Sequence, residues 1–250
     1  MRVRDIYQWI DTVAPFETQE AFDNSGMLVG DPEAEVQGIY CALDVTASVL
    51  DAAEQCGANL ILTHHPMLFG GRKSLLEEPL DHEGRLLARM LRQHLQLIAA
   101  HTNLDQAPGG INDVLAETLG LREIEGDGFL RTGLLPAPMS GEAWIRHAGD
   151  VLHTVIRPYG DPHRSVRRVA VCSGAGSDYW LEAARRWPID SFVTGEIRHH
   201  HGLGMSECGI LGLEAGHYAT EAPGIFALGE ALQKYLHAVE CPVHVHHPLG

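Results

Sequence analysis

Residues 44–65, DVTASVLDAAEQCGANLILTHH, combine the signals of a helix and of a buried strand. Their apolar residues first recur at helical spacing, from about 46–56, and then run together at the centre of the predicted strand NLILT (59–63). A helix that leads at once into a fully apolar strand is typical of a parallel sheet covered by helices. The stretch ends on two adjacent histidines, His64 and His65, which are expected at the carboxyl end of that strand.

The same alternation of helices and strands continues on both sides of this stretch. Apolar periods and turn residues predict strands at 27–30, 38–43, 59–63, 95–100, 167–172, 191–194, 210–215 and 242–246. They predict helices at 3–13, 46–56, 82–93, 110–119, 177–186, 199–207 and 221–236. Glycines and prolines interrupt the pattern between 121 and 165. We therefore expect an α/β protein with mostly parallel sheets, made of a first lobe (1–120), a connecting segment (121–165) and a second lobe (166–250), packed together as one unit.

The two lobes are expected to be similar, because two patterns occur in each. Residues 44–65 and the stretch SGAGSDYWLEAARRWPIDSFVTGE (173–196) both contain a helix, a turn and an apolar strand that ends on threonine. LIAAHTNLD (97–105) and LEAGHYATE (213–221) both place an acid four residues after a histidine. We interpret these matches as a duplicated α/β unit, the alternative being that short αβ segments resemble each other by chance.

The composition indicates a globular protein and argues against several classes. The chain has 250 residues, of which 45% are hydrophobic and 20% charged, enough for one large core or two smaller lobes. Its net charge of −15, without a basic cluster, argues against nucleic-acid binding. No apolar run approaches the roughly 18 residues of a membrane span, and Asp5 and Asp11 stand where a signal peptide would be apolar. We therefore expect a cytoplasmic protein with no membrane contact.

Sixteen histidines are unusual, and four of them are predicted at the carboxyl ends of strands, where ligands gather in parallel α/β sheets. Two acids follow histidines at a spacing of four residues, which brings imidazole and carboxylate about one helical turn apart. Nitrogen and oxygen donors suit zinc, iron or manganese, and the five cysteines include no CxxC pair for a thiolate zinc site. The candidate ligands are His64, His65, His101, Asp105, His217 and Glu221.

Each candidate also has a simpler interpretation. A histidine at a strand end is often only a hydrogen-bonding residue, and THHP (63–66) is compatible with a turn before Pro66. His217 and Glu221 are compatible with a helix start in which Glu221 favours the helix dipole and Thr220 caps the first turn. The agreement between equivalent places in the two halves favours the metal site over these simpler interpretations.

Five stretches of the chain, in this order, match a known pattern: AFDNSGMLVG (21–30), LTHHPMLF (62–69), AAHTNLDQAPGGIND (99–113), FVTGE (192–196) and GHYATE (216–221). The chain resembles the GTP cyclohydrolase I type 2 homologues, also called NGG-interacting-factor-3-like proteins. The resemblance covers nearly the whole sequence. One departure is Phe22, which stands where the family commonly has tryptophan.

The resemblance implies a dinuclear metal centre between two similar α/β lobes, and subunits assembled into a toroidal hexamer. Two divalent ions (zinc, iron or manganese) are expected per chain. Carried over onto this sequence, the ligands are His64, His65, Asp105, His217 and Glu221. His101 is expected either as a further ligand or as a partner of the ligands.

We expect a metal-dependent hydrolase, in which water made acidic by two ions attacks the substrate. His101 or Glu196 is expected to transfer protons. The family name implies a small-molecule substrate, a nucleotide or pterin-like compound, opened or cleaved at a ring or amide bond. Phosphoester hydrolysis is the chemical alternative. Two further hypotheses stay open: a non-catalytic, metal-binding regulator or scaffold, and an α/β protein whose histidines are purely structural.

Overall fold

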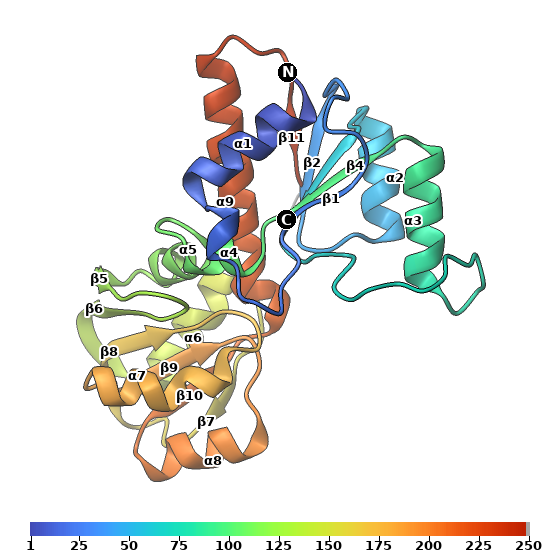
Figure 1. Cartoon of the computed structure of the whole chain (residues 1–250). Helices are drawn as coiled ribbons and strands as arrows, with labels where there is room; N and C mark the ends of the chain where they lie inside the picture. Colours follow the sequence, from blue (N-terminus) through green and yellow to red (C-terminus); the bar gives the residue numbers. More distant parts are fainter. Residues whose placement is uncertain (249–250) are drawn as a thin grey trace. The chain divides into compact units, whose positions relative to one another are not determined.

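The structure is a computed structural model of the chain and describes residues 1–248. It contains two compact units (Figure 1). The first consists of Met1–Ala107 and Ile225–Gly250, and the second of Pro108–Gly224. The lobe boundaries expected from the sequence, at 120 and 165, stay a prediction.

The first unit is built on a five-stranded sheet with the order β1-β4-β3-β2-β11. Its strands are β1 (Gly26–Val29), β2 (Ile39–Ala42), β3 (Leu60–Thr63), β4 (Gln96–Ala99) and β11 (Val245–His246). β2, β3, β4 and β11 are parallel, whereas the edge strand β1 runs antiparallel to β4. Its helices are α1 (Val3–Val13), η1 (Phe16–Thr18), α2 (Ala47–Cys56), α3 (His82–Arg92) and α4 (Thr102–Gln106).

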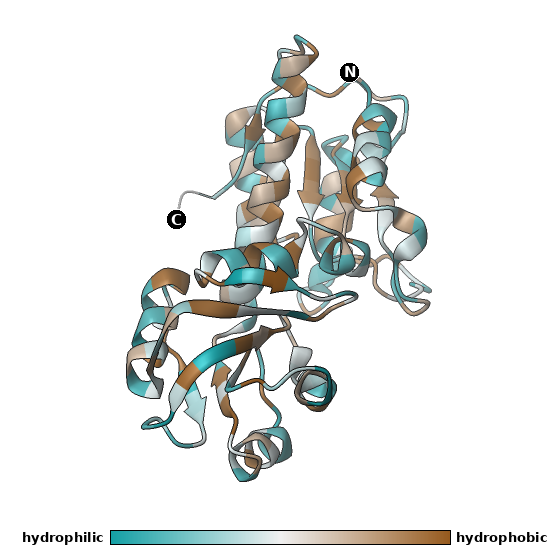
Figure 2. Cartoon of the chain, turned by 90° about the vertical axis from the view of Figure 1, so that its left-hand side faces the viewer, coloured by the Kyte–Doolittle hydropathy of each residue, from teal (hydrophilic) through white to brown (hydrophobic). Residues whose placement is uncertain are grey.

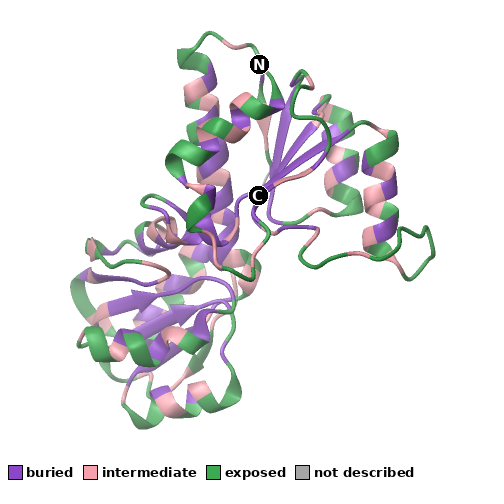
Figure 3. Cartoon of the chain, in the orientation of Figure 1, coloured by how far each residue is buried: buried purple, intermediate pink, exposed green. Residues whose placement is uncertain are grey.

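Local sequence signals fix the limits of the helix that precedes β3. Thr46 accepts a hydrogen bond from the amide of Val49 at 3.2 Å and so caps α2 at its start. Gly57 ends the helix with φ 72°, a left-handed conformation that glycine adopts without steric cost. The apolar residues of β2, β3 and β4 are buried on both faces, as Figure 3 shows for the sheet. This burial explains their unbroken apolar sequence.

The second unit is built on a six-stranded sheet with the order β5-β6-β8-β9-β10-β7. Its strands are β5 (Arg122–Glu125), β6 (Arg131–Ser140), β7 (Arg157–Tyr159), β8 (Ser165–Val171), β9 (Ser191–Thr194) and β10 (Leu211–Glu214). β8, β9 and β10 are parallel, and the remaining pairs are antiparallel. Its helices are α5 (Ile111–Thr118), α6 (Gly141–Leu152), η2 (Gly176–Tyr179), α7 (Trp180–Arg186) and α8 (His199–Glu207), with the start of α9 (His217–Ala238).

Apolar side chains cover both faces of this second sheet. One cluster is centred on the fully buried Trp144 of α6 and Leu115 of α5. The other joins Trp180 of α7 and Met205 of α8 to Phe192 of β9. Figure 2 shows apolar residues, in brown, along parts of the strands, whereas the helices mix brown and teal residues.

The segment 121–165 contains more regular structure than its sequence suggested. It forms β5, β6, α6 and β7. Pro136 and Pro138 lie within β6 where its pairing with β8 shifts register, between Leu134 and Met139. A proline is tolerated in a strand at such an irregularity because no ladder hydrogen bond is required from its nitrogen. The prolines therefore mark a bulge in a strand and not the absence of one.

Both sheets contain the same arrangement of strands. In each sheet three parallel strands lie side by side in chain order: β2-β3-β4 in the first and β8-β9-β10 in the second. In each sheet an antiparallel strand from earlier in the sequence pairs with the last of the three: β1 with β4, and β7 with β10. The predicted α/β class with two similar, mostly parallel sheets is confirmed. Within residues 1–248 no helix has the length and apolar character needed to cross a membrane.

The repeat is offset by one residue at its two histidine motifs. Thr63 pairs with Ala99 in the first sheet, and Thr194 pairs with Glu214 in the second. If the two threonines are equivalent, His101 corresponds to Gly216, and not to His217 as the HxxxD and HxxxE spacing suggested. The helices agree, because α4 begins one residue after His101 whereas α9 begins on His217 itself.

Candidate metal-binding site

Three histidines of the first unit gather at the carboxyl ends of adjacent parallel strands. His64 and His65 directly follow β3, and His101 lies two residues after the end of β4. One nitrogen from each ring lies within 4.8 Å of the corresponding nitrogens of the other two. The centre of the His64 ring is 5.1 Å from that of His65 and 5.0 Å from that of His101. The pairing of β3 with β4 thus brings together side chains that are far apart in sequence.

The backbone fixes the orientation of the fully buried His64 ring. Its Nδ1 atom lies 2.8 Å from the carbonyl oxygen of Ala100. A carbonyl oxygen can only accept a hydrogen bond, so Nδ1 carries the proton. The lone pair is then on Nε2, the nitrogen that a metal ion requires.

Carboxylates orient the other two rings in the same way. His65 Nδ1 lies 2.7 Å from Asp44 Oδ1, and His101 Nδ1 lies 2.8 Å from Asp23 Oδ1. An ionised carboxylate also only accepts, so each ring keeps its lone pair on Nε2. A histidine held at one nitrogen by an oxygen acceptor is the usual arrangement of a metal-binding imidazole.

Asp23 is the most completely enclosed of these acceptors. Its side chain is fully buried, and Oδ2 accepts hydrogen bonds from the amide and the hydroxyl of Thr102 at 3.0 and 2.5 Å and from the Ser25 hydroxyl at 2.9 Å. Burial opposes ionisation, but the hydrogen bonds from His101 and Thr102 outweigh it and hold the pKa of Asp23 well below its usual range. Asp23 is therefore a fixed negative charge behind the His101 ring.

Asp105 belongs to the same group of side chains. It lies one turn into α4, where its amide donates to the His101 carbonyl at 2.9 Å. Asp105 Oδ1 is 3.6 Å from His64 Nε2, and the carboxylate is nearly buried. Two ligands of one tetrahedral ion, each about 2.0 to 2.2 Å from it, lie roughly 3.3 Å apart. The separation of these two atoms therefore fits a shared metal ion better than a direct hydrogen bond.

The second unit repeats this arrangement with its own residues. His217 Nδ1 lies 2.7 Å from Glu196 Oε1, and His217 Nε2 lies 3.0 Å from Glu221 Oε2. Glu196 follows β9 by two residues, and Glu221 lies one turn after His217 on α9. Nδ1 again faces an acceptor, and Nε2 is placed beside the second carboxylate.

Glycine makes room for the buried Glu221 carboxylate. Gly174 has φ +57°, and a Cβ atom at this position would lie 2.0 Å from Glu221 Oε1. Its amide donates to Thr220 Oγ1 at 3.1 Å, and the Thr220 hydroxyl is also 2.9 Å from the carbonyl oxygen of His217. Thr220 thus lies inside the first turn of α9 and links it to Gly174. The alternative interpretation, in which Thr220 caps the helix start, does not hold, because α9 begins three residues earlier, at His217.

A family model described as Duf34/NIF3 (NGG1p interacting factor 3) matches residues 1–248. The chain belongs to the NIF3 family. It is 32% identical to the GTP cyclohydrolase 1 type 2 homolog of Clostridium acetobutylicum, over 95% of this chain and 91% of that protein. It is 31% identical to the protein of the same name from Clostridium perfringens, over 94% and 93%. The family expected from the sequence motifs is confirmed.

Solved structures share the fold of this chain. Staphylococcus aureus protein SA1388 superimposes with a TM-score of 0.94 at 25% identity, covering 100% of this chain and 97% of that one. Reduced HcgD from Methanocaldococcus jannaschii superimposes with a TM-score of 0.79 at 26% identity, covering 98% and 97%.

In this NIF3-family chain the structure groups the predicted site residues within each unit. His64, His65, His101 and Asp105 lie together in the first unit, and His217, Glu221 and Glu196 in the second. Sequence reasoning missed the two carboxylates that orient histidines, Asp23 and Asp44. Asp23 lies in the motif AFDNSG, and Asp44 follows the end of β2, so both positions carried a signal.

Proposed function

We propose that this NIF3-family chain binds two divalent ions, zinc, iron or manganese, and hydrolyses a small nucleotide or pterin-like substrate. The proposed ligands are His64, His65, Asp105, His217 and Glu221. The observation that carries the proposal is the shared orientation of the histidines. In each ring an oxygen acceptor faces Nδ1, which leaves Nε2 to bind a metal.

The donor set fits such ions. Imidazole nitrogens and carboxylate oxygens are the ligands that zinc, iron and manganese accept. All five cysteines lie in the described residues, and none of them forms a disulfide. Bound ions would supply an activated water and polarise the substrate. The protein supplies carboxylate oxygens at Asp105 and Glu221, both nearly buried, and holds the histidines at their Nδ1 atoms.

Two further residues are proposed to move protons. The Glu196 side chain is 61% exposed and touches His217 Nδ1 through Oε1, so it can exchange a proton with solvent. His101, with its Nε2 turned away from Asp23, is proposed as the second proton carrier.

The substrate class comes from the names of the relatives, GTP cyclohydrolase 1 type 2 homologs. We propose that this chain likewise acts on a nucleotide or a pterin-like ring, in the cytoplasm and as a homo-oligomer, the toroidal hexamer implied by the resemblance. Light scattering on the purified chain tests the oligomer: six protein masses are expected, and a monomer contradicts it.

Turnover tests the enzymatic part of the proposal. Protein loaded separately with zinc, iron or manganese is incubated with GTP, a pterin and a phosphodiester, and the products are resolved by chromatography. We expect ring or amide hydrolysis that falls at least 100-fold in Glu221→Gln and is unchanged in Asp150→Asn, a surface carboxylate of α6. Release of phosphate alone would identify a phosphoesterase. Metal binding without any turnover would indicate a regulator or scaffold.

A further inference from the structure

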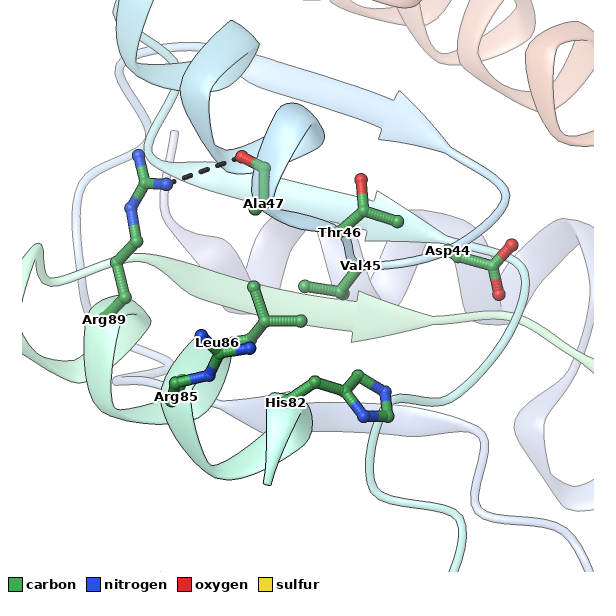
Figure 4. A pocket seen from close by; sticks show the side chains of 8 residues that line it. All are labelled: Asp44, Val45, Thr46, Ala47, His82, Arg85, Leu86 and Arg89. Atoms are coloured by element: carbon green, nitrogen blue, oxygen red, sulfur yellow. Dashed lines mark hydrogen bonds between the residues drawn. The ribbon is translucent and has the colours of Figure 1, made fainter. Parts of the chain in front are cut away.

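A cavity of about 510 Å³ opens between α2 and α3 in the first unit (Figure 4). It lies beyond the carboxyl end of β2, where the chain turns from Asp44 into α2. Ligands of parallel α/β proteins bind at this end of a sheet, and the volume is typical of a small-molecule pocket.

The cavity adjoins a smaller hollow beside a candidate metal ligand. A second hollow of about 160 Å³ is lined by His65 and shares Asp44, Val45, His82 and Leu86 with the larger cavity. Arg85 lines only the larger one. A molecule that fills both therefore has one end at His65 and the other at Arg85.

The two arginines of the larger cavity differ in their partners. Arg89 binds Asp51 Oδ1 at 2.6 Å and Glu54 Oε2 at 3.2 Å, and it also reaches the Ala47 carbonyl at 3.4 Å. Its charge is therefore neutralised while it joins α3 to α2. Arg85 is exposed, and its side chain forms no ion pair or hydrogen bond with any residue among 1–248. Its guanidinium is the cation available to a ligand.

The remaining walls suit a molecule with an apolar ring and an anionic group. Val45 and Leu86 are the larger apolar side chains of the cavity, which Ala47 also lines, and Figure 4 shows Val45 and Leu86 close to each other. The first residues of α2 form part of the rim, and amide groups at a helix start attract anions. Arginine binds phosphate oxygens through two parallel N–H groups.

We propose that this cavity binds the phosphoryl group of an organic monophosphate at Arg85, with its ring between Val45 and Leu86 and its reactive end at His65. The placement of the reactive end rests on the proposed metal-dependent function. The geometry has a chemical consequence. Because Arg85 holds the phosphoryl group at the end away from His65, hydrolysis takes place in the ring or at an amide, and the phosphoester bond stays intact.

Calorimetry on the full chain, freed of metal with a chelator, tests the cavity without requiring catalysis. The probes are guanosine 5′-monophosphate, guanosine and inorganic phosphate. We expect the monophosphate to bind at least tenfold more tightly than guanosine or phosphate alone. Arg85→Leu removes that preference, and Arg146→Leu, an exposed arginine of α6, keeps it. Ala47→Trp, which fills the rim, weakens binding of both nucleoside probes at least tenfold.

Equal affinity for the monophosphate and guanosine, or a preference that survives Arg85→Leu in a folded protein, overturns the proposal. Circular dichroism establishes folding of each variant. The two proposals fail separately. Arg85-dependent binding without turnover by the metal-loaded protein would contradict the proposed hydrolase activity and support the proposed binding cavity. Turnover with unchanged binding in Arg85→Leu would contradict the proposed binding cavity alone.

Discussion

His101 Nδ1 lies 2.8 Å from Oδ1 of Asp23, a carboxylate that is completely enclosed by protein. Asp23 belongs to the loop before β1, whereas His101 follows β4, so this contact ties two distant segments beside the candidate site. Its function is to hold the imidazole in one orientation and one tautomer. Asp44 and Glu196 hold His65 and His217 in the same manner.

Asp44→Asn is expected to weaken metal binding about 10- to 100-fold, because the amide no longer fixes the tautomer of His65, a proposed ligand. Competition with a chromophoric chelator measures the affinity. Asp150→Asn is the matched surface control. An affinity within twofold of wild type, in a variant with an unchanged melting temperature, would show that the carboxylate has no part in the site.

Gly174→Ala is expected to displace Glu221. The added Cβ would lie 2.0 Å from Glu221 Oε1 and 3.2 Å from His217 Nε2. The positive φ alone costs about 1 to 2 kcal/mol for a residue with a side chain. Gly57→Ala controls for that strain, since Gly57 has φ +72° and no atom near its Cβ position. Metal content is expected to fall in Gly174→Ala only; equal metal content in the two variants would contradict the role assigned to Gly174.

The thiol of Cys41 is expected to be inert. Burial raises the pKa of Cys41 to about 12, whereas an unfolded cysteine titrates near about 8.5. The unfolded chain therefore releases its proton first, and the stability that Cys41 contributes is present below about pH 8.5 and is lost as pH rises toward 12. Between pH 9 and 10, wild type should lose about 1 kcal/mol more unfolding free energy than Cys41→Ala.

Denaturant titration at the two pH values measures that difference, and alkylation supplies a second test. At pH 8 the exposed Cys208 should react with iodoacetamide while Cys41 does not. Modification of Cys41 in the folded protein as fast as of Cys208 would contradict its burial.

The sequence was most informative where burial forces a simple pattern. The helix predicted at 3–13 and the strand predicted at 191–194 have the predicted limits. An amphipathic helical period predicts a surface helix, and a short, mainly apolar run between turns predicts a buried strand. The segment 121–165 was less readable. There Pro136 and Pro138 lie in a strand at a register shift. Prolines occur in loops as well as at such bulges, so the local sequence did not distinguish the two.

The candidate ligands could be predicted because strand ends and helical spacing place them. The carboxylates that orient the histidines could not be predicted. Asp23 reaches His101 through a contact 78 residues apart in sequence, and Asp44 reaches His65 across 21 residues. Such contacts depend on the order of strands in the sheet, which the spacing of apolar residues along the sequence does not specify. The one-residue offset between the two histidine motifs also depends on strand pairing. It is visible only because Thr63 pairs with Ala99, whereas Thr194 pairs with Glu214.

Metal content per chain decides whether the five proposed ligands hold two ions. Elemental analysis of untagged protein, supplied with zinc, iron or manganese and then dialysed, is compared with Asp105→Ala and Glu221→Ala. The account predicts about two ions per wild-type chain and a loss of bound metal in both variants. Less than about a tenth of an ion per chain, unchanged in the variants and not restored by added metal, would contradict it.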